Sequence, residues 1–145
     1  MKYMVLILLL SINTAVLAQK NEIVKEKWHW GNPVKQDTTA GYVQVVKVDN
    51  ILYISGAVST AVTPEGITQV YLALERSLKS FGAGFQNVVK ENLYTTAIEA
   101  MKKYNDSRKA FYKKDFPAAT WIQVERLYMS DAKLEVELVA HLLKN

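Results

Sequence analysis

Two glutamates near the C-terminus have the spacing of side chains that share one face of a strand. Glu135 and Glu137 lie two residues apart within the alternating stretch 133–142, and side chains at positions i and i+2 of a strand point to the same side. Paired carboxylates can do acid–base chemistry or hold an attacking water. Strand faces also carry such pairs only for solubility, and the sequence leaves both interpretations open.

Other reactive residue types exclude several kinds of site. The chain has no cysteine, which rules out disulfides, thiolate metal sites and a cysteine nucleophile. His29 and His141 are far apart and show no metal-ligand spacing, so we expect no metal site. Glycine-rich phosphate-binding motifs and the Gly-x-Ser-x-Gly motif are also missing. We therefore expect no cofactor.

Composition predicts one ordinary globular domain. The chain has 145 residues, a formal charge of +4, 50% hydrophobic and 22% charged residues. Its basic residues are interleaved with acids, except for a run on one expected helix. Because no nucleic-acid motif accompanies this run, we expect a solvated helix face and no nucleic-acid partner. The run comprises Lys102, Lys103, Arg108, Lys109, Lys113 and Lys114.

The first 18 residues are typical of a secretory signal peptide. Lys2 supplies the positive region, 5–10 the apolar region, and 15–18 the small residues that precede cleavage after Ala18. The apolar run is shorter than the ~20 residues of a membrane span. We expect a cleaved leader over 1–18, a periplasmic or secreted domain over 19–145, and no membrane span after leader removal. A retained N-terminal anchor is the alternative.

Apolar periodicity predicts the elements of the first half. Residues 27–30 alternate as a short strand or extended lead-in. Residues 42–48 and 51–55 are two strands around the turn dipeptide Asp49-Asn50, which predicts a hairpin. Between 64 and 82, apolar residues recur at intervals of three and four, which predicts an amphipathic helix.

The second half predicts a strand over 88–96, a helix over 98–114 and strands over 120–126 and 133–142. We expect the last two strands to pair antiparallel, because their connection is short. The order ββ-α-β-α-ββ predicts a two-layer α+β domain with helices on one sheet face. The other face would be an interface, a ligand cleft or a solvated surface. We expect it to mix Trp121, Gln123, Glu125, Glu135, Glu137 and Val139.

Several segments occur in the order, and near the spacings, of the RidA family (YjgF or L-PSP), which the chain resembles over 40–140. The resemblance implies a chorismate-mutase-like fold and a homotrimer with a central barrel and three clefts between subunits. Active members hydrolyse enamines and imines of 2-oxo acids to release ammonia, without metal or cofactor. The matching segments are 41–48, 51–56, 88–90, 116–118, 124–127 and 134–140.

The resemblance also implies site residues. Glu135 matches the family glutamate that positions the attacking water, Tyr42 its cleft tyrosine, and Ser55 with Gly56 the pair that lines the cleft. The arginine that grips the substrate carboxylate falls on Ala119. Trp121 replaces a smaller side chain, and is either interface packing or an aromatic wall for a neutral ligand.

The missing arginine decides the functional expectation. Arginine holds a carboxylate with two charge-assisted hydrogen bonds, and their loss costs ~3 kcal/mol or more, roughly a hundredfold in rate. We therefore expect small-metabolite binding in the clefts with the usual deaminase activity lost or weakened. An altered imine, enamine or carbonyl substrate, with water held by Glu135, is one alternative. An interaction role that uses the basic helix is another.

Overall fold

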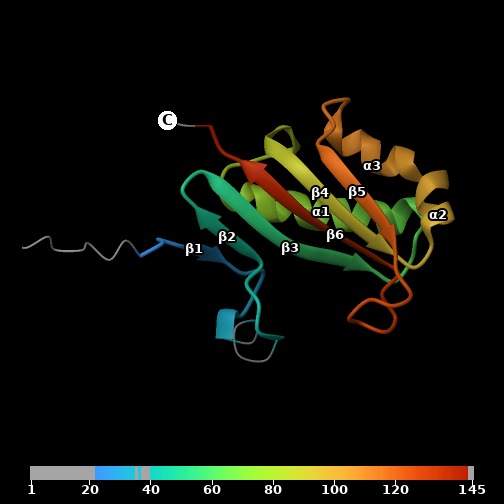
Figure 1. The fold of residues 1–145 in the computed structure, drawn as a ribbon, viewed down its shortest axis with the longest axis horizontal. Helices are drawn as coiled ribbons and strands as arrows, with labels where there is room; N and C mark the ends of the chain where they lie inside the picture. Colours follow the sequence, from blue (N-terminus) through green and yellow to red (C-terminus); the bar gives the residue numbers. More distant parts are fainter. Residues whose placement is uncertain (1–21, 35, 37–39, 144–145) are drawn as a thin grey trace, which may run out of the picture.

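A six-stranded mixed sheet carries its helices on one face (Figure 1). The computed structural model describes residues 22–34, 36 and 40–143, so the expected leader lies outside the described residues. The elements are β1 (Glu26–Trp28), β2 (Val45–Val48), β3 (Ile51–Ser59), α1 (Pro64–Lys79), the 3-10 turn η2 (Phe85–Asn87), β4 (Val88–Thr95), α2 (Ile98–Lys103), α3 (Asn105–Tyr112), β5 (Ala118–Gln123) and β6 (Leu134–His141).

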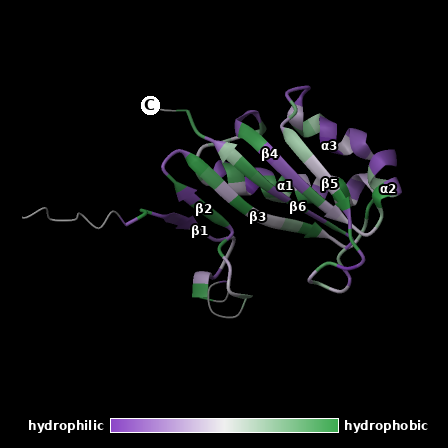
Figure 2. Ribbon diagram, in the orientation of Figure 1, coloured by the Kyte–Doolittle hydropathy of each residue, from purple (hydrophilic) through white to green (hydrophobic). Residues whose placement is uncertain are grey.

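The two layers form as the sequence predicts. Helix α1 begins at Pro64, where the Thr63 hydroxyl accepts a hydrogen bond from the Gly66 N–H at 3.1 Å. Its apolar stripe packs on the sheet, and the core between the layers is mainly apolar. Figure 2 shows hydrophobic residues along β3 and β6 and mostly hydrophilic ones on α3. Fully buried core residues include Leu52, Ile67, Tyr71, Leu74, Leu78, Leu93, Met101 and Leu134.

The predicted hairpin is confirmed. Val48 pairs with Ile51, and Asp49 between the strands has a positive φ of 52°, a conformation that Asp tolerates in turns. Strand β3 continues beyond the predicted end at Ser55 and reaches Ser59. Its pairing with β6 is irregular between Ile54 and Ala57. This irregularity sets the orientation of the intervening residues, including Gly56.

The predicted pairing of the last two strands is wrong. The strand order is β1-β2-β3-β6-β4-β5, so β6 lies in the centre between β3 and β4. Strand β5 lies at the sheet edge and pairs in parallel with β4. The reason is burial: alternate residues of β6 are buried under the helices, whereas β5 is mostly exposed. The ten-residue connection 124–133 is long enough to allow this crossing.

The prediction of one continuous helix over 98–114 is also wrong. This segment is divided at Tyr104 into α2 and α3, where Asn105 and Asp106 favour local turns over helix interior. The break turns Arg108 and Tyr112 toward the core, where Arg108 is 6% exposed. Arg108 is therefore not part of a solvated basic face. Lys102 and Lys109 are exposed, as expected, and pair with Glu99 and Asp106.

Candidate functional site

A cavity of about 550 Å³ opens on the sheet face that the helices leave free. It brings together four of the residues predicted from the family resemblance: Tyr42, Ser55, Gly56 and Glu135. A volume of this size is within the ~300–1,000 Å³ of small-molecule sites. The complete lining is Trp30, Ala40, Tyr42, Ser55, Gly56, Val58, Tyr128, Met129, Glu135 and Glu137.

Glu135 is the half-buried carboxylate of this cavity. It lies directly over the Gly56 backbone, where an added Cβ would be only 2.7 Å from the Glu135 Cγ, so glycine at 56 leaves room for the carboxylate. Burial, and then the charge of Glu137, raise the pKa of Glu135. Within the described part of the chain, no hydrogen bond or ion pair reaches this carboxylate.

Glu137 has partners on the neighbouring strand. The Asn92 amide donates to Glu137 Oε1 at 2.8 Å, and the Tyr94 hydroxyl donates to the same oxygen at 3.2 Å. Burial and the Glu137 carboxylate raise the pKa of Tyr94, so this hydroxyl remains a hydrogen-bond donor. Glu137 is thus held in the sheet, whereas Glu135 is left available to a ligand.

Ser55 and Tyr42 shape the cavity in different ways. The Ser55 hydroxyl donates to the Val43 carbonyl at 2.7 Å, and the Ser55 N–H donates to the Gln44 carbonyl at 2.9 Å. These bonds attach the loop that precedes β2 to β3. Tyr42, on that loop, is 42% exposed. Ser55 therefore positions the cavity wall, and Tyr42 is part of the lining.

Ala119 and Trp121, the other two predicted site residues, lie on the opposite face of the sheet. In the parallel β4–β5 pair, Glu91 lies beside Ala119 and Leu93 beside Trp121, and Leu93 belongs to the core under the helices. The expectation that Trp121 and Gln123 lie on the free face is therefore wrong. Parallel pairing with β4 turns Trp121 and Gln123 toward the helices. The Ile98 N–H, at the start of α2, donates a hydrogen bond to Gln123 Oε1 at 3.2 Å.

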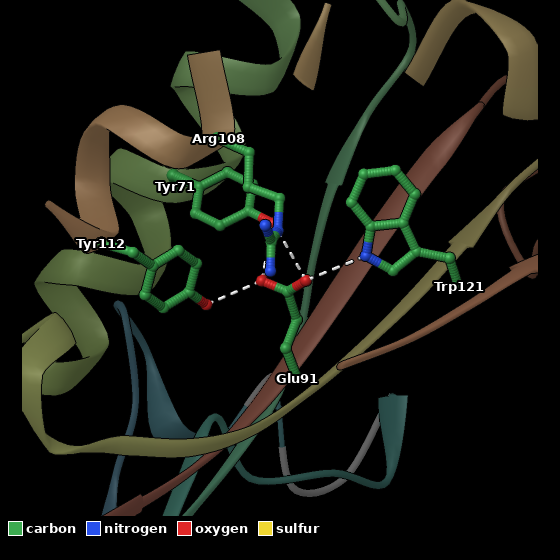
Figure 3. A network of polar contacts seen from close by, with 5 residues as sticks. All are labelled: Tyr71, Glu91, Arg108, Tyr112 and Trp121. Atoms are coloured by element: carbon green, nitrogen blue, oxygen red, sulfur yellow. Dashed lines mark hydrogen bonds and ion pairs between the residues drawn. The ribbon is translucent and has the colours of Figure 1, made fainter. Parts of the chain in front are cut away.

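A buried glutamate, Glu91, binds the side chains around Trp121 (Figure 3). Its Oε2 accepts hydrogen bonds from the hydroxyls of Tyr71 at 2.9 Å and Tyr112 at 2.7 Å. Its Oε1 accepts from Arg108 Nε at 2.8 Å and from Trp121 Nε1 at 3.2 Å. Burial, and then Glu91, raise the pKa of both tyrosines. Four donors satisfy a carboxylate that is 0% exposed.

Arg108 brings a guanidinium to the β5 edge of the sheet, which carries Ala119, the residue expected to stand in place of an arginine. Its Cζ lies 4.9 Å from the ring centre of Tyr112, 5.3 Å from Trp121 and 5.9 Å from Phe116. Burial acts to lower the pKa of Arg108, but Glu91 together with Tyr71 and Tyr112 outweighs it, and the pKa is raised. The charge is therefore permanent, and Glu91 already neutralises it.

The sequence interpretation missed Trp30, Tyr128 and the Glu91 network. A signal for the network exists: Glu91 has the same parity as Leu93 and Thr95 in its strand, all of which are buried, and a buried carboxylate requires donors. No comparable signal brings Trp30 to the cavity, because it is 105 residues from Glu135 along the chain. Within 22–34, 36 and 40–143, no cluster of metal-ligating side chains is found. Those residues also form no helix of membrane-spanning length and hydropathy.

Comparison with known proteins agrees with this fold. The profile of the family described as endoribonuclease L-PSP matches residues 33–142. Structures of the same fold include Rv2704, a YjgF/YER057c/UK114 family member from Mycobacterium tuberculosis. It has a TM-score of 0.73 and 18% identity, and the match covers 82% of this chain and 100% of that one. RidA from a Psychrobacter species matches with a TM-score of 0.64 at 24% identity, over 70% of this chain and 88% of that one.

Curated relatives agree at the level of sequence. A RutC family protein of Buchnera aphidicola is 33% identical over 110 residues, 68% of this chain and 85% of the relative. The human protein named 2-iminobutanoate/2-iminopropanoate deaminase is 31% identical over 108 residues, 68% of this chain and 78% of the relative. The chain belongs to the RidA family, and its α+β fold is the fold of that family.

Proposed function

We propose that this protein binds a small metabolite in clefts between subunits and that its hydrolysis of anionic 2-imino acids is lost or strongly weakened. The single observation that carries the proposal is Ala119 at the family's arginine position, beside an arginine whose charge is already matched. Arg108 is buried and bound to Glu91 at 2.8 Å, so it offers an incoming carboxylate no net positive charge.

The division of the candidate residues supports a site shared between subunits. Tyr42, Ser55, Gly56 and Glu135 line the cavity on the free sheet face, whereas Ala119 and Trp121 lie across the sheet at its edge. A homotrimer would complete each cavity with the edge strand of a neighbour. We also propose export by a leader over 1–18, cleaved after Ala18.

Ammonia release from freshly generated 2-aminoacrylate tests the loss of activity. We expect the wild-type rate to stay near the uncatalysed rate and the A119R variant to raise it at least tenfold, since ~3 kcal/mol of carboxylate binding is restored. L72R is the matched control, because Leu72 is exposed on α1, away from the free sheet face. A119R/W121A covers the case in which the indole blocks the new side chain. Wild-type turnover well above the uncatalysed rate would refute the proposal.

One observation favours a second function, an enamine or imine deaminase with an altered substrate. Glu135 has a raised pKa and no bonded partner among the described residues, which suits a group that positions water for attack on a C=N carbon. Addition of that water and loss of ammonia would leave a carbonyl product. E135Q should then abolish turnover of an accepted imine while the assembly stays intact, and an unchanged rate would exclude this function.

A further inference from the structure

The cavity beside Glu135 is lined by aromatic rings and carboxylates and not by basic groups. The aromatic residues of its lining are Trp30, Tyr42 and Tyr128, and the acidic ones are Glu135 and Glu137. Among the described residues that line it, there is no lysine, arginine or histidine. The lining is therefore partly apolar and electronegative, which is unfavourable for an anionic guest.

Trp30 is held in place from outside the cavity. Its indole Nε1 donates to Ser77 Oγ at 3.1 Å, and its carbonyl accepts a hydrogen bond from Arg76 Nη2 at 2.7 Å. The same guanidinium lies 5.7 Å from the ring centre of Trp28. Both polar partners belong to α1, so the ring is attached to the helix layer. A ring held in this way is pre-organised for a ligand.

We infer that the cavity binds an organic cation with an aromatic or bulky apolar group, a primary ammonium or iminium ion, and that Trp30 and Glu135 select it. This inference rests on the proposed function in one respect, because both place the ligand in the same cavity. Glu135 receives no hydrogen bond from the described residues, so it can pair with the cationic nitrogen at close range. The faces of Trp and Tyr rings attract cations and pack against apolar groups.

Calorimetric titration of the wild-type protein tests this ligand class with three probes. They are 2-phenylethylammonium, n-butylammonium, which lacks the ring, and 3-phenylpropanoate, which replaces the cation by an anion. We expect the first to bind at least tenfold more tightly than either of the others. E135Q and W30A should each weaken its binding at least tenfold. E65Q, which removes an exposed carboxylate on α1, is the matched control and should leave the affinity unchanged.

A conservative variant separates ligand contact from a structural role. W30F keeps an aromatic ring, so it should retain most of the affinity that W30A loses, with both variants folded by circular dichroism. Equal weakening by W30F and W30A would overturn the role of the Trp30 ring. Binding of 3-phenylpropanoate as tightly as 2-phenylethylammonium, or binding that is unaffected by E135Q, would overturn the inference.

These outcomes are distinct from failure of the proposed function. The titration requires no turnover, so amine binding together with rapid 2-aminoacrylate hydrolysis would refute the loss of deaminase activity but leave the inference standing. Conversely, the wild-type deaminase rate could be low and be raised by A119R while the wild-type protein shows no selective amine binding. That result would overturn the inference and leave the proposed function standing.

Discussion

Glu91 and Glu135 are two carboxylates in one sheet with opposite surroundings. Glu91 is fully buried and accepts hydrogen bonds from four side chains. Glu135 is half-buried, and its carboxylate has no hydrogen-bond or ion-pair partner within the described residues. The negative charge of Glu137 acts on it unfavourably. The first carboxylate is committed to the fold, whereas the second is available to a ligand. At the scale of single residues, the number of hydrogen-bond donors around each carboxylate, and not its burial alone, distinguishes the structural glutamate from the one available to a ligand.

The raised pKa of Glu135 predicts a pH dependence of stability. Burial, and then Glu137, raise this pKa above its ordinary value of 4.5, so the folded chain retains a proton that the unfolded chain has lost. The contribution of this retained proton to the free energy of unfolding is complete below about pH 4.5. It disappears as the pH rises through the pKa of Glu135 in the folded chain. The free energy of unfolding of E135Q minus that of wild type should therefore increase across this range.

Urea unfolding at a series of pH values between about 4 and 8 measures this difference. E125Q, which removes an exposed carboxylate, controls for the loss of charge alone. A difference between E135Q and wild type that does not change with pH would contradict the prediction. Glu137 and Tyr94 are the titratable groups that share this part of the sheet face.

At the scale of elements, the Glu91 network joins the helix layer to the strands β4 and β5 of the sheet. Tyr71 comes from α1, Arg108 and Tyr112 from α3, and Trp121 from β5. All converge on Glu91 in β4. The network therefore links the edge strand that carries Ala119 to the helix layer.

Removing Glu91 should destabilise the protein strongly. E91A leaves the Arg108 charge buried and unpaired, and such a change costs about 3–5 kcal/mol of unfolding free energy. The double variant E91L/R108M, which replaces the ion pair by apolar side chains, should cost much less than the sum of the two single changes. Chemical denaturation measures all of these values.

The exposed pair of Glu99 and Lys102 is the matched control, since both side chains are mostly exposed and such pairs contribute at most about 1 kcal/mol. A loss for E91A as small as that for E99A would mean that the network does not stabilise the fold. Additive losses in the double variant would mean that Glu91 and Arg108 are not energetically coupled.

At the scale of the whole molecule, the free sheet face and the β5 edge are the surfaces that a homotrimer would cover. Ile122 on β5 is 45% exposed, and Tyr53 and Val58 on β3 are 49% and 41% exposed. The segment Ala118–Gln123 carries no charged residue. Uncharged edge strands tend to pair with another chain, which supports assembly here.

Sedimentation should give a mass three times that of the chain, and I122E should shift it toward the monomer because a charge in an apolar interface is costly. L72E is the matched control: Leu72 is 51% exposed on α1, away from the free sheet face. A monomeric wild-type protein, or dissociation by L72E to the same extent as I122E, would contradict this prediction and the shared site that depends on it.

Local patterns predict local elements well in this chain. The Asp49-Asn50 turn, the helix that begins at Pro64 and the alternation in 134–141 all appear as expected. The break at Tyr104 and the parallel position of β5 do not, because each depends on packing between residues far apart in the sequence. Arg108 illustrates this: it belongs to a basic run in the sequence and to a buried ion pair in the fold.

The sequence by itself determined the family, the order of the elements and the identity of Ala119 at a position where an arginine is expected, since residue types and their spacing are properties of the chain. The family resemblance assigned Tyr42, Gly56 and Glu135 to one cleft, but only the tertiary structure decided that Ala119 and Trp121 lie across the sheet from them. Strand order and register set these faces. They result from the competition of distant segments for the same buried positions, which no local pattern records.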